Sequence, residues 1–304
     1  MIKKTIPFMA IRNLAFAVTV VLTLIGIGAL IVKGLNFGLD FTGGTLIELQ
    51  YERPADLERI KAELGQAGYT DAVVQSFGAS TDVLVRLASD DPQLGSKVAE
   101  ALHKLDPDVA FELKRVEFVG PQVGEELRDQ GGLAMLLALG GILVYLAFRF
   151  QWKFGVGAVA SLFHDTVITL GVLAFFEIPF DLTVLAAVLA MIGYSLNDTI
   201  IIYDRIRENF RVLRKASLIE NIDISITQTL LRTMATSFST ALALIALLLF
   251  GGDTLANFAL TLLVGVVVGT YSSVYIGATV LVWLKLTSED LIPPAVNEEV
   301  DGRP

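Results

Sequence analysis

Six long apolar segments constrain the fold of this 304-residue chain more than any other feature. Each is long enough to cross about 30 Å of hydrocarbon as an α-helix. Buried helices of soluble proteins usually keep a polar face, whereas stretches such as LALIALLLF and LLVGVVVG have almost none. The sequence therefore predicts an α-helical polytopic membrane protein with six transmembrane helices, at roughly 13–33, 131–149, 154–176, 182–203, 232–250 and 255–284.

The basic residues of the short connections predict an orientation. Lys and Arg concentrate before the first segment, between the second and third, and between the fourth and fifth. The connections at 177–181 and 251–253 have none. Because cytoplasmic loops carry an excess of Lys and Arg, both termini are expected in the cytoplasm. The long connection between the first two helices is then external.

These boundaries divide the chain into four parts. We expect a cytoplasmic N-terminus with the first transmembrane helix at 1–33, and an external domain at 34–130. A bundle of the other five helices follows at 131–286, and an acidic, proline-containing cytoplasmic tail at 287–304 is expected to be disordered. The external block holds 18 acidic and 9 basic residues, and its net charge of −9 equals the formal charge of the whole chain.

Composition excludes several functions. The acidic balance argues against a nucleic-acid partner, which needs a basic surface. The absence of cysteine excludes disulfides, thiol catalysis and cysteine-ligated metals. Two histidines leave little room for a histidine-rich metal site. We expect no metal site, no cofactor and no catalytic constellation.

The external block alternates between strand and helix periodicity. TLIELQY (45–51) predicts a strand, Pro54 begins a helix that ends near Gly68, and two strands follow at 72–78 and 82–88. Pro92 begins a second helix, and 110–120 predicts the last strand. The order β-α-β-β-α-β indicates a small α+β domain of the ferredoxin-like, split-βαβ class.

Three ionisable residues lie within the apolar segments: Asp165, Asp198 and Arg232. Such groups cost several kcal/mol in a membrane, so they usually mark a pathway, a proton relay or a buried pair. Structural alternatives are a hydrogen-bonded buried carboxylate for either Asp and a snorkelling interfacial cation for Arg232. A charge crossing the membrane field gains about 2.3 kcal/mol per 100 mV, which is enough to bias a two-state equilibrium.

Polar residues at helical spacing accompany these charges. We expect a hydrated seam in which polar stripes of three helices face one another. Span six also has small residues four apart, which permit close helix packing inside the chain or between subunits. The stripes are Ser161, Asp165 and Thr169; Tyr194, Ser195, Asp198 and neighbouring Asn197 and Thr199; and Gln228, Thr229, Arg232, Thr236, Ser239 and Thr240. The small residues are Gly265, Gly269, Ser273 and Gly277.

Several motifs together resemble one family. They are GLDFTGGT (38–45), VGPQVGEELRDQG (119–131), LFHDTVITLG (162–171), GYSLNDTIIIYDRIREN (193–209), QTLLRTMATS (228–237) and LFGG (249–252). In this order and topology they are similar to the SecF family, the smaller membrane subunits of the SecD–SecF complexes of bacterial protein export. The match covers nearly the whole chain.

The resemblance implies a function and partners. SecF-like proteins of the bacterial inner membrane pair with SecD and resemble resistance-nodulation-division (RND) transporters. They associate with the SecYEG translocon and often with YajC and YidC. They use the proton motive force, or sodium in some members, to promote late steps of export of unfolded polypeptide after SecA has acted. Membrane lipid surrounds the bundle.

The resemblance also assigns residues. The intramembrane carboxylate of the family falls on Asp198, its functional arginine on Arg232, and its HD motif on Asp165. The LDFTGG motif places Asp40, Gly43 and Gly44 at the base of the external domain, where a turn role for Asp40 is an equal alternative.

Two other functions remain as alternatives. A non-energised scaffold that stabilises the translocon would need the buried charges only as structural groups. An intramembrane aspartyl protease would need Asp165 and Asp198 to share a proton. Such enzymes, by resemblance, carry GxGD around one Asp, whereas the sequence here is SLND (195–198).

Overall fold

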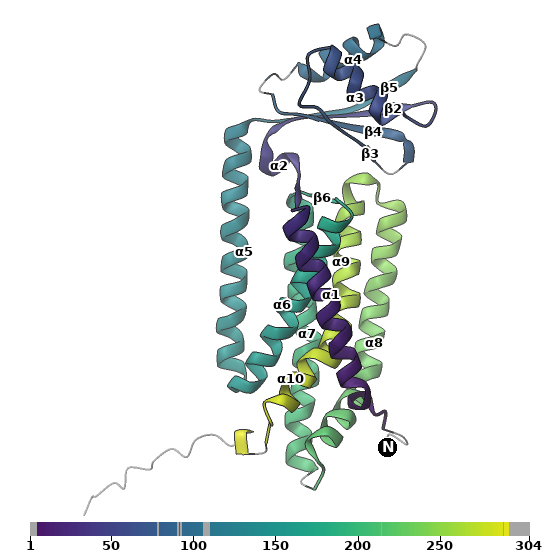
Figure 1. The fold of residues 1–304 in the computed structure, drawn as a ribbon. Helices are drawn as coiled ribbons and strands as arrows, with labels where there is room; N and C mark the ends of the chain where they lie inside the picture. Colours follow the sequence, from purple (N-terminus) through teal and green to yellow (C-terminus); the bar gives the residue numbers. More distant parts are fainter. Residues whose placement is uncertain are drawn as a thin grey trace, which may run out of the picture. The chain divides into compact units, whose positions relative to one another are not determined.

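The computed structural model describes residues 5–77, 79–89, 91, 93–105, 110–213, 215–287 and 289–291. They form two compact units (Figure 1). The smaller unit comprises 36–136 and 179–185, and the larger unit contains the other described residues. The sequence did not indicate that 179–185, which include the start of the fourth apolar helix, group with the smaller unit.

The smaller unit contains a four-stranded antiparallel sheet with strand order β3-β4-β2-β5. Its elements occur in the predicted order: β2 (Gly44–Tyr51), α3 (Leu57–Gln66), β3 (Val73–Phe77), β4 (Ala79–Leu87), α4 (Leu94–Leu105) and β5 (Phe111–Val119). Asp56 caps α3 by accepting the Arg59 N–H at 3.1 Å. Pro92, the predicted first residue of the second helix, lies outside the described residues.

Alternation along the strands creates the core of this sheet. Ile47, Leu49 and Tyr51 of β2 point to the same side as Val83 and Val85 of β4, because every second side chain shares a face. They pack against residues of α3 and α4, among them Leu64 and Val98, which are fully buried. Two shorter elements, β1 (Asn36–Phe37) and α2 (Leu39–Thr42), precede β2, and β1 pairs in parallel with β6 (Pro179–Phe180).

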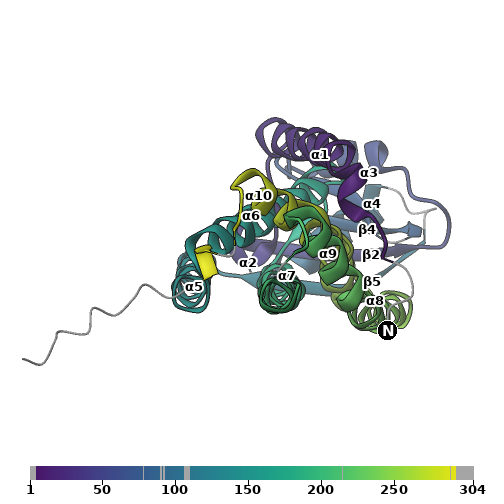
Figure 2. The ribbon, with the colours of Figure 1, turned by 90° about the horizontal axis from the view of Figure 1, so that it is seen from below.

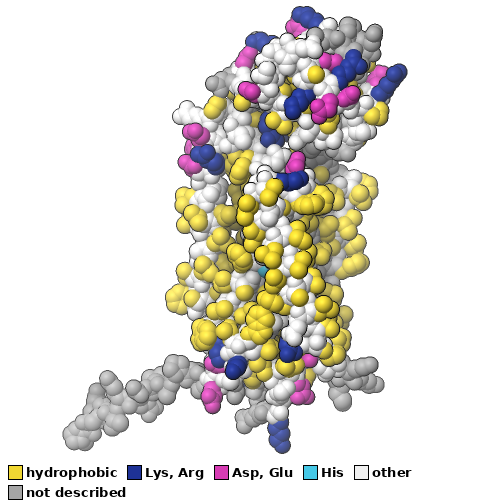
Figure 3. All heavy atoms as spheres, in the orientation of Figure 1, with side chains coloured by type: hydrophobic (Ala, Val, Ile, Leu, Met, Phe, Trp, Pro, Cys, Tyr) yellow, Lys and Arg dark blue, Asp and Glu magenta, His cyan; other side chains and the backbone are white. Residues whose placement is uncertain are grey.

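Six helices of the described chain are long and apolar enough to cross a membrane. They are α1 (Arg12–Val32) with the preceding 3-10 turn η1 (Phe8–Ile11), α5 (Pro121–Arg149), α6 (Trp152–Phe175), α7 (Leu182–Val212), α8 (Leu218–Phe250), and α9 (Asp253–Ser272) with its continuation. The continuation is a π turn, η2 (Ser273–Gly277), followed by α10 (Ala278–Trp283). Hydrophobic side chains cover the visible face of the larger unit (Figure 3).

Several helices extend beyond the predicted apolar segments. α5 begins ten residues earlier, at Pro121, because proline suits the first helical turn and the polar residues after it continue the helix. α8 begins at Leu218 rather than 232, because Ser217 caps it by accepting the Glu220 N–H. This Ser-x-x-Glu pattern is that of a capping box. Hydropathy detects the apolar part of a helix and not its polar turns.

Within the larger unit, α6 packs against α1 and α9, and α9 also packs against α8 (Figure 2). Of the tail predicted to be disordered, Glu289–Leu291 form a short 3-10 turn, η3, and Asp290 pairs with Lys153 at 2.6 Å. Residues 288 and 292–304 lie outside the described residues.

Candidate ion-relay site

Asp198 lies on α7 and is 1% exposed. Neither of its carboxylate oxygens accepts a hydrogen bond of normal geometry from a described residue. The Ser237 hydroxyl and the Arg232 guanidinium of α8 lie close enough to interact with it electrostatically. A buried carboxylate with so few partners is costly when it is charged.

The hydroxyl nearest to this carboxylate is engaged elsewhere. Ser237 is within 2.8 Å of the Thr270 hydroxyl on α9 and accepts from Tyr194 of α7 at 3.4 Å. Thr233, one turn before Ser237 on α8, is also buried, and its hydroxyl has no partner among the described residues. Asp198 therefore faces a part of the α7–α8 contact whose polar groups bond to one another or remain unpaired.

The inward face of α8 differs from the predicted stripe. Thr229, Thr233 and Ser237 are buried, whereas Arg232 is exposed. Each helical residue turns by about 100°, so Arg232 and Thr233 cannot share a face. Thr236 bonds to carbonyl oxygens of its own helix. The sequence analysis missed Thr233 and Ser237. Residues 229, 233 and 237 have the same four-residue spacing as residues 228, 232 and 236, so spacing alone does not show which set faces inward.

Another α8 residue of the predicted seam, Gln228, joins a different network. Gln228 accepts a hydrogen bond from Asn209 of α7 at 3.0 Å. Asn209 also donates to Ser225 at 2.8 Å, and both of these residues are buried. A second polar contact between α7 and α8 thus lies eleven residues beyond Asp198.

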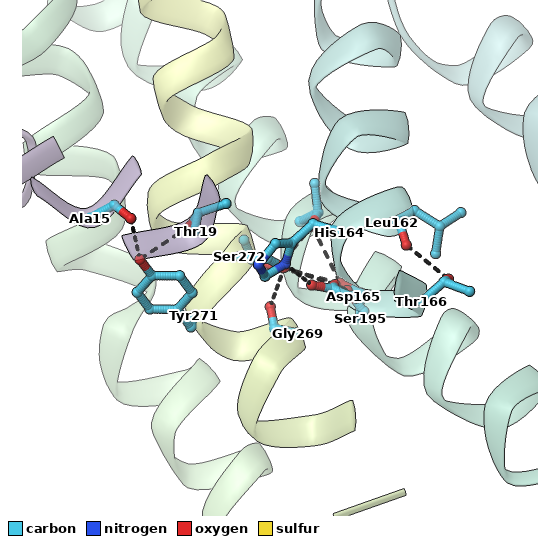
Figure 4. Close-up of polar contacts among 12 residues, drawn as sticks. Ala15, Thr19, Leu162, His164, Asp165, Thr166, Ser195, Gly269, Tyr271 and Ser272 are labelled. Carbon is cyan, nitrogen blue, oxygen red and sulfur yellow. Dashed lines mark hydrogen bonds and ion pairs between the residues drawn. The ribbon is translucent and has the colours of Figure 1, made fainter. Parts of the chain in front are cut away.

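Asp165 of α6 is fully buried and well partnered (Figure 4). Its Oδ2 accepts from the Ser195 hydroxyl at 2.5 Å and from the Ser272 hydroxyl at 2.8 Å. Its Oδ1 lies 3.0 Å from Nδ1 of His164. Residues of three helices, α6, α7 and α9, therefore converge on one carboxylate.

The predicted neighbours of Asp198 are thus divided between two sites. Ser195 belongs to the Asp165 cluster, Thr199 lies within 2.8 Å of the Ser273 hydroxyl in the π turn, and Asn197 is exposed. The hydrogen bonds of Asp165 do not include Asp198, so the two carboxylates do not form the proton-sharing pair that an aspartyl protease needs.

His164 and Ser272 were not predicted. The HD dipeptide was the available signal for His164.

The small-residue ladder of the last span packs inside the chain. A Cβ on Gly269 would lie 2.8 Å from Cβ of Ser195, and one on Gly265 would overlap Met191. A Cβ on Gly277 would lie 2.8 Å from the Tyr203 hydroxyl oxygen. All three neighbours belong to α7, so internal packing accounts for the ladder.

The predicted motif residues Asp40, Gly43 and Gly44 lie together in the smaller unit. Oδ2 of Asp40 accepts the N–H of Leu182, in the first turn of α7, at 3.0 Å. Gly43 and Gly44 both have positive φ, of 65° and 111°. A Cβ on Gly43 would lie 2.9 Å from Pro121 Cα, and one on Gly44 would lie 2.5 Å from the Leu87 carbonyl oxygen. Both positions require glycine.

A family model described as protein export membrane protein SecD/SecF, C-terminal, matches residues 97–287. A second, described as the SecD/SecF GG motif, matches residues 28–55, which include Asp40, Gly43 and Gly44. The chain belongs to the SecD/SecF family. Its six long apolar helices and this family membership make it a membrane protein.

SecD/SecF relatives cover nearly the whole chain. The protein translocase subunit SecF of Pseudomonas aeruginosa is 67% identical over 300 residues, which are 99% of this chain and 98% of that protein. The subunit of the same name from Vibrio alginolyticus is 47% identical, over 98% of this chain and 95% of that protein.

Solved SecDF structures also match. The crystal structure of SecDF, a translocon-associated membrane protein from Thermus thermophilus, has a TM-score of 0.84 and 36% identity over 94% of this chain. SecDF in a super-membrane-facing form has a TM-score of 0.69 over the same share. This chain spans 39% of each SecDF chain, about two fifths of its length.

Proposed function

We propose that this chain is the SecF-type subunit of a SecD–SecF complex and that an ion gradient, acting through Asp198, promotes late steps of Sec-dependent export. The observation that carries the proposal is the buried carboxylate of Asp198, whose oxygens accept no hydrogen bond of normal geometry from the described residues. Its charged form is costly in this position, so proton or cation binding changes the energy of the surrounding helices.

The outward face of α8 supports a partner subunit. Arg232 is exposed there beside Leu231, Met234 and Phe238, although the helix is apolar enough to span a membrane. A cation on such a face is costly in lipid, and it is stabilised when another membrane protein covers it. We propose that a SecD-type subunit covers this face and completes the ion pathway next to Asp198.

The same proposal includes location and orientation. The larger unit lies in the bacterial inner membrane with both termini cytoplasmic, as the basic connections favour. The smaller unit is then periplasmic. Its element order and its strand order, β3-β4-β2-β5, support a ferredoxin-like domain. Exported unfolded polypeptide is its proposed contact, and the proposed partners beyond SecD are SecYEG, YajC and YidC, with SecA acting earlier.

The test is export into inverted membrane vesicles that contain the Asp198→Asn variant together with its SecD-type partner. Gradient-stimulated export should disappear while the amount of the complex stays normal. Normal stimulation would contradict the relay, and a fall in the amount of complex alone would favour the scaffold function. Comparing export driven by a proton gradient with export driven by a sodium gradient in the same assay identifies the coupling ion.

A further inference from the structure

An apolar groove lies between the C-terminal part of α5 and the N-terminal half of α6. Both of its walls belong to the larger unit, which contains residues 137–178. Its volume is about 660 Å³, within the range of about 300–1,000 Å³ that is usual for ligand pockets. The described residues that line it are all apolar or glycine, among them the buried Leu146 and Phe150 and the exposed Leu143 and Phe163. A hydrocarbon chain therefore suits this groove, and a polar ligand does not.

The length of the groove matches one leaflet of a membrane. Its lining extends along α6 from Trp152 to Phe163, which are eleven residues apart. At 1.5 Å per residue this is about 16 Å along the helix axis. The hydrocarbon core of a bilayer is about 30 Å thick, so one leaflet contributes about 15 Å. Both wall helices are long and apolar enough to cross a membrane, so the groove opens onto lipid acyl chains of nearly its own length.

Basic side chains gather at one end of the groove. Trp152, the first residue of α6, is 63% exposed there, and Trp is frequent where a membrane meets water. The guanidinium carbons of Arg149 and Arg207 lie 5.0 and 5.7 Å from the centre of the Phe150 ring. Nζ of Lys153 lies 5.8 Å from the centre of the Trp152 ring. Three cations therefore lie against the two aromatic rings that line this end.

The acidic partners of these cations do not balance their charge. Lys153 pairs with Asp290 at 2.6 Å. Arg149 and Arg207 both donate to Asp204, at 2.5 and 3.4 Å, so two guanidinium groups share one carboxylate. One positive charge thus remains among these five groups. A guanidinium has five N–H donors, and phosphate is one of the anions that it binds in a bidentate manner.

We propose that this groove binds one acyl chain of an anionic phospholipid, whose phosphate lies beside Arg149 and Arg207. The apolar lining and the leaflet length account for the chain, and the unbalanced charge selects the headgroup. The site is separate from the outward face of α8, because α7 stands between α5 and α8 in Figures 1 and 2. The inference requires a membrane around the larger unit and does not depend on an ion relay at Asp198.

The test uses the two tryptophans of the chain, Trp152 and Trp283. Trp283→Phe leaves the indole in the groove, and Trp152→Phe leaves an indole that contacts the Phe16 ring of α1 and does not line the groove. Each full-length variant is placed in vesicles that contain brominated phosphatidylglycerol or brominated phosphatidylcholine with the same acyl chains. Bromine quenches indole fluorescence on contact, so quenching reports which lipid occupies each position.

Trp152 should show a relative affinity for phosphatidylglycerol roughly 5-fold above that for phosphatidylcholine. This ratio corresponds to about 1 kcal/mol, the usual contribution of one basic residue that meets an anionic lipid. The preference at Trp283 should be smaller. Arg149→Gln, made in the Trp283→Phe background, should abolish the preference at Trp152 and leave quenching by phosphatidylcholine unchanged.

A matched pair of glycine variants tests the seat of the acyl chain. A Cβ on Gly155 or on Gly141 would meet nothing within 4 Å, but Gly155 lines the groove and Gly141 of α5 does not. In the same background, Gly155→Phe should fill the groove and abolish the preference for phosphatidylglycerol. Gly141→Phe should keep it.

Three results would overturn the proposal. Equal quenching of Trp152 by the two lipids would mean that no headgroup is selected. A preference for phosphatidylglycerol that survives Gly155→Phe would mean that the basic surface attracts the lipid without an acyl chain in the groove. Absence of quenching by either lipid would mean that another polypeptide, such as a second copy of this chain, covers the groove.

Discussion

Two buried carboxylates of the same bundle have opposite surroundings. Asp165 accepts two hydroxyl hydrogen bonds and lies beside an imidazole, whereas Asp198 accepts no hydrogen bond of normal geometry from the described residues. Both are nearly inaccessible to solvent. Burial alone therefore does not distinguish the two carboxylates, whereas their hydrogen-bond partners do.

The difference lies in what each position stabilises. The partners of Asp165 come from α6, α7 and α9, so its carboxylate links three helices and keeps one arrangement. The carboxylate of Asp198 accepts no hydrogen bond of normal geometry from the described residues of another helix. It can therefore bind or release an ion without breaking a hydrogen-bond network. A group that must gain and lose an ion needs the second kind of site. Substitutions at the two carboxylates and at their neighbours should therefore differ in their effect on the free energy of unfolding.

The largest effect is expected for Asp165→Ala. Two buried hydroxyls and His164 lose their partner, so the free energy of unfolding should fall by about 2–4 kcal/mol. Thermal unfolding of the purified protein in detergent measures the loss. Asn197→Ala, at an exposed position of α7, is the control. Unchanged melting of the Asp165 variant would show that the cluster is not structural.

Removing one donor should have a smaller effect. Ser272→Ala deletes one hydrogen bond to Asp165, and hydrogen bonds between membrane helices average about 0.6 kcal/mol, with a maximum near 1.7 kcal/mol. The same melting experiment should show a small decrease. Ser239→Ala, at an exposed position of α8, should melt like the unmodified protein. An equal decrease in thermal stability in both variants would show that the hydrogen bond from Ser272 to Asp165 does not stabilise the protein.

Asp198→Asn should change the free energy of unfolding by less than about 1 kcal/mol, because no hydrogen bond among described residues is lost and a buried charge is removed. Gradient-stimulated export should nevertheless disappear. Denaturation and export measured on the same preparation check both parts. A large destabilisation would place Asp198 in the same class as Asp165 and break the contrast.

The smallest effect is expected for Thr233→Val. The two side chains have nearly the same shape, and the buried hydroxyl of Thr233 has no partner among the described residues. Its removal should be neutral or stabilise the protein by up to about 1 kcal/mol. Thr236→Val on the outward side is the comparison. A clear loss of stability in Thr233→Val would mean that the hydroxyl is bonded in the membrane.

Local patterns explain which features could be predicted. Each apolar helix and each strand of the four-stranded sheet has its own signal of period or length, so their order follows from the sequence. The rotation of α8 has no such signal, since polar residues at 228, 232 and 236 and at 229, 233 and 237 give two parallel stripes. Packing against α7 and α9 selects the second.

Other features depend on contacts between distant residues. Ser195 and Asp198 share a face of α7, yet Ser195 bonds to Asp165, because a helical face is wide enough to contact two neighbours. The pairing of Phe37 with Phe180 joins two-residue segments far apart in the chain, and neither segment has a strand pattern. Only the DFTGG motif pointed to that region.

The π turn at Ser273–Gly277 lets two consecutive residues face inward. Ser272 bonds to Asp165 of α6, and Ser273 contacts Thr199 of α7, and both serines are fully buried. If the same residues formed a regular α-helix, everything after this turn would be rotated by about 100°. Thr279 and Leu281, now buried, would turn away from their neighbours. The one extra residue of the π turn therefore determines which side chains at the C-terminal end of the last membrane helix face the bundle.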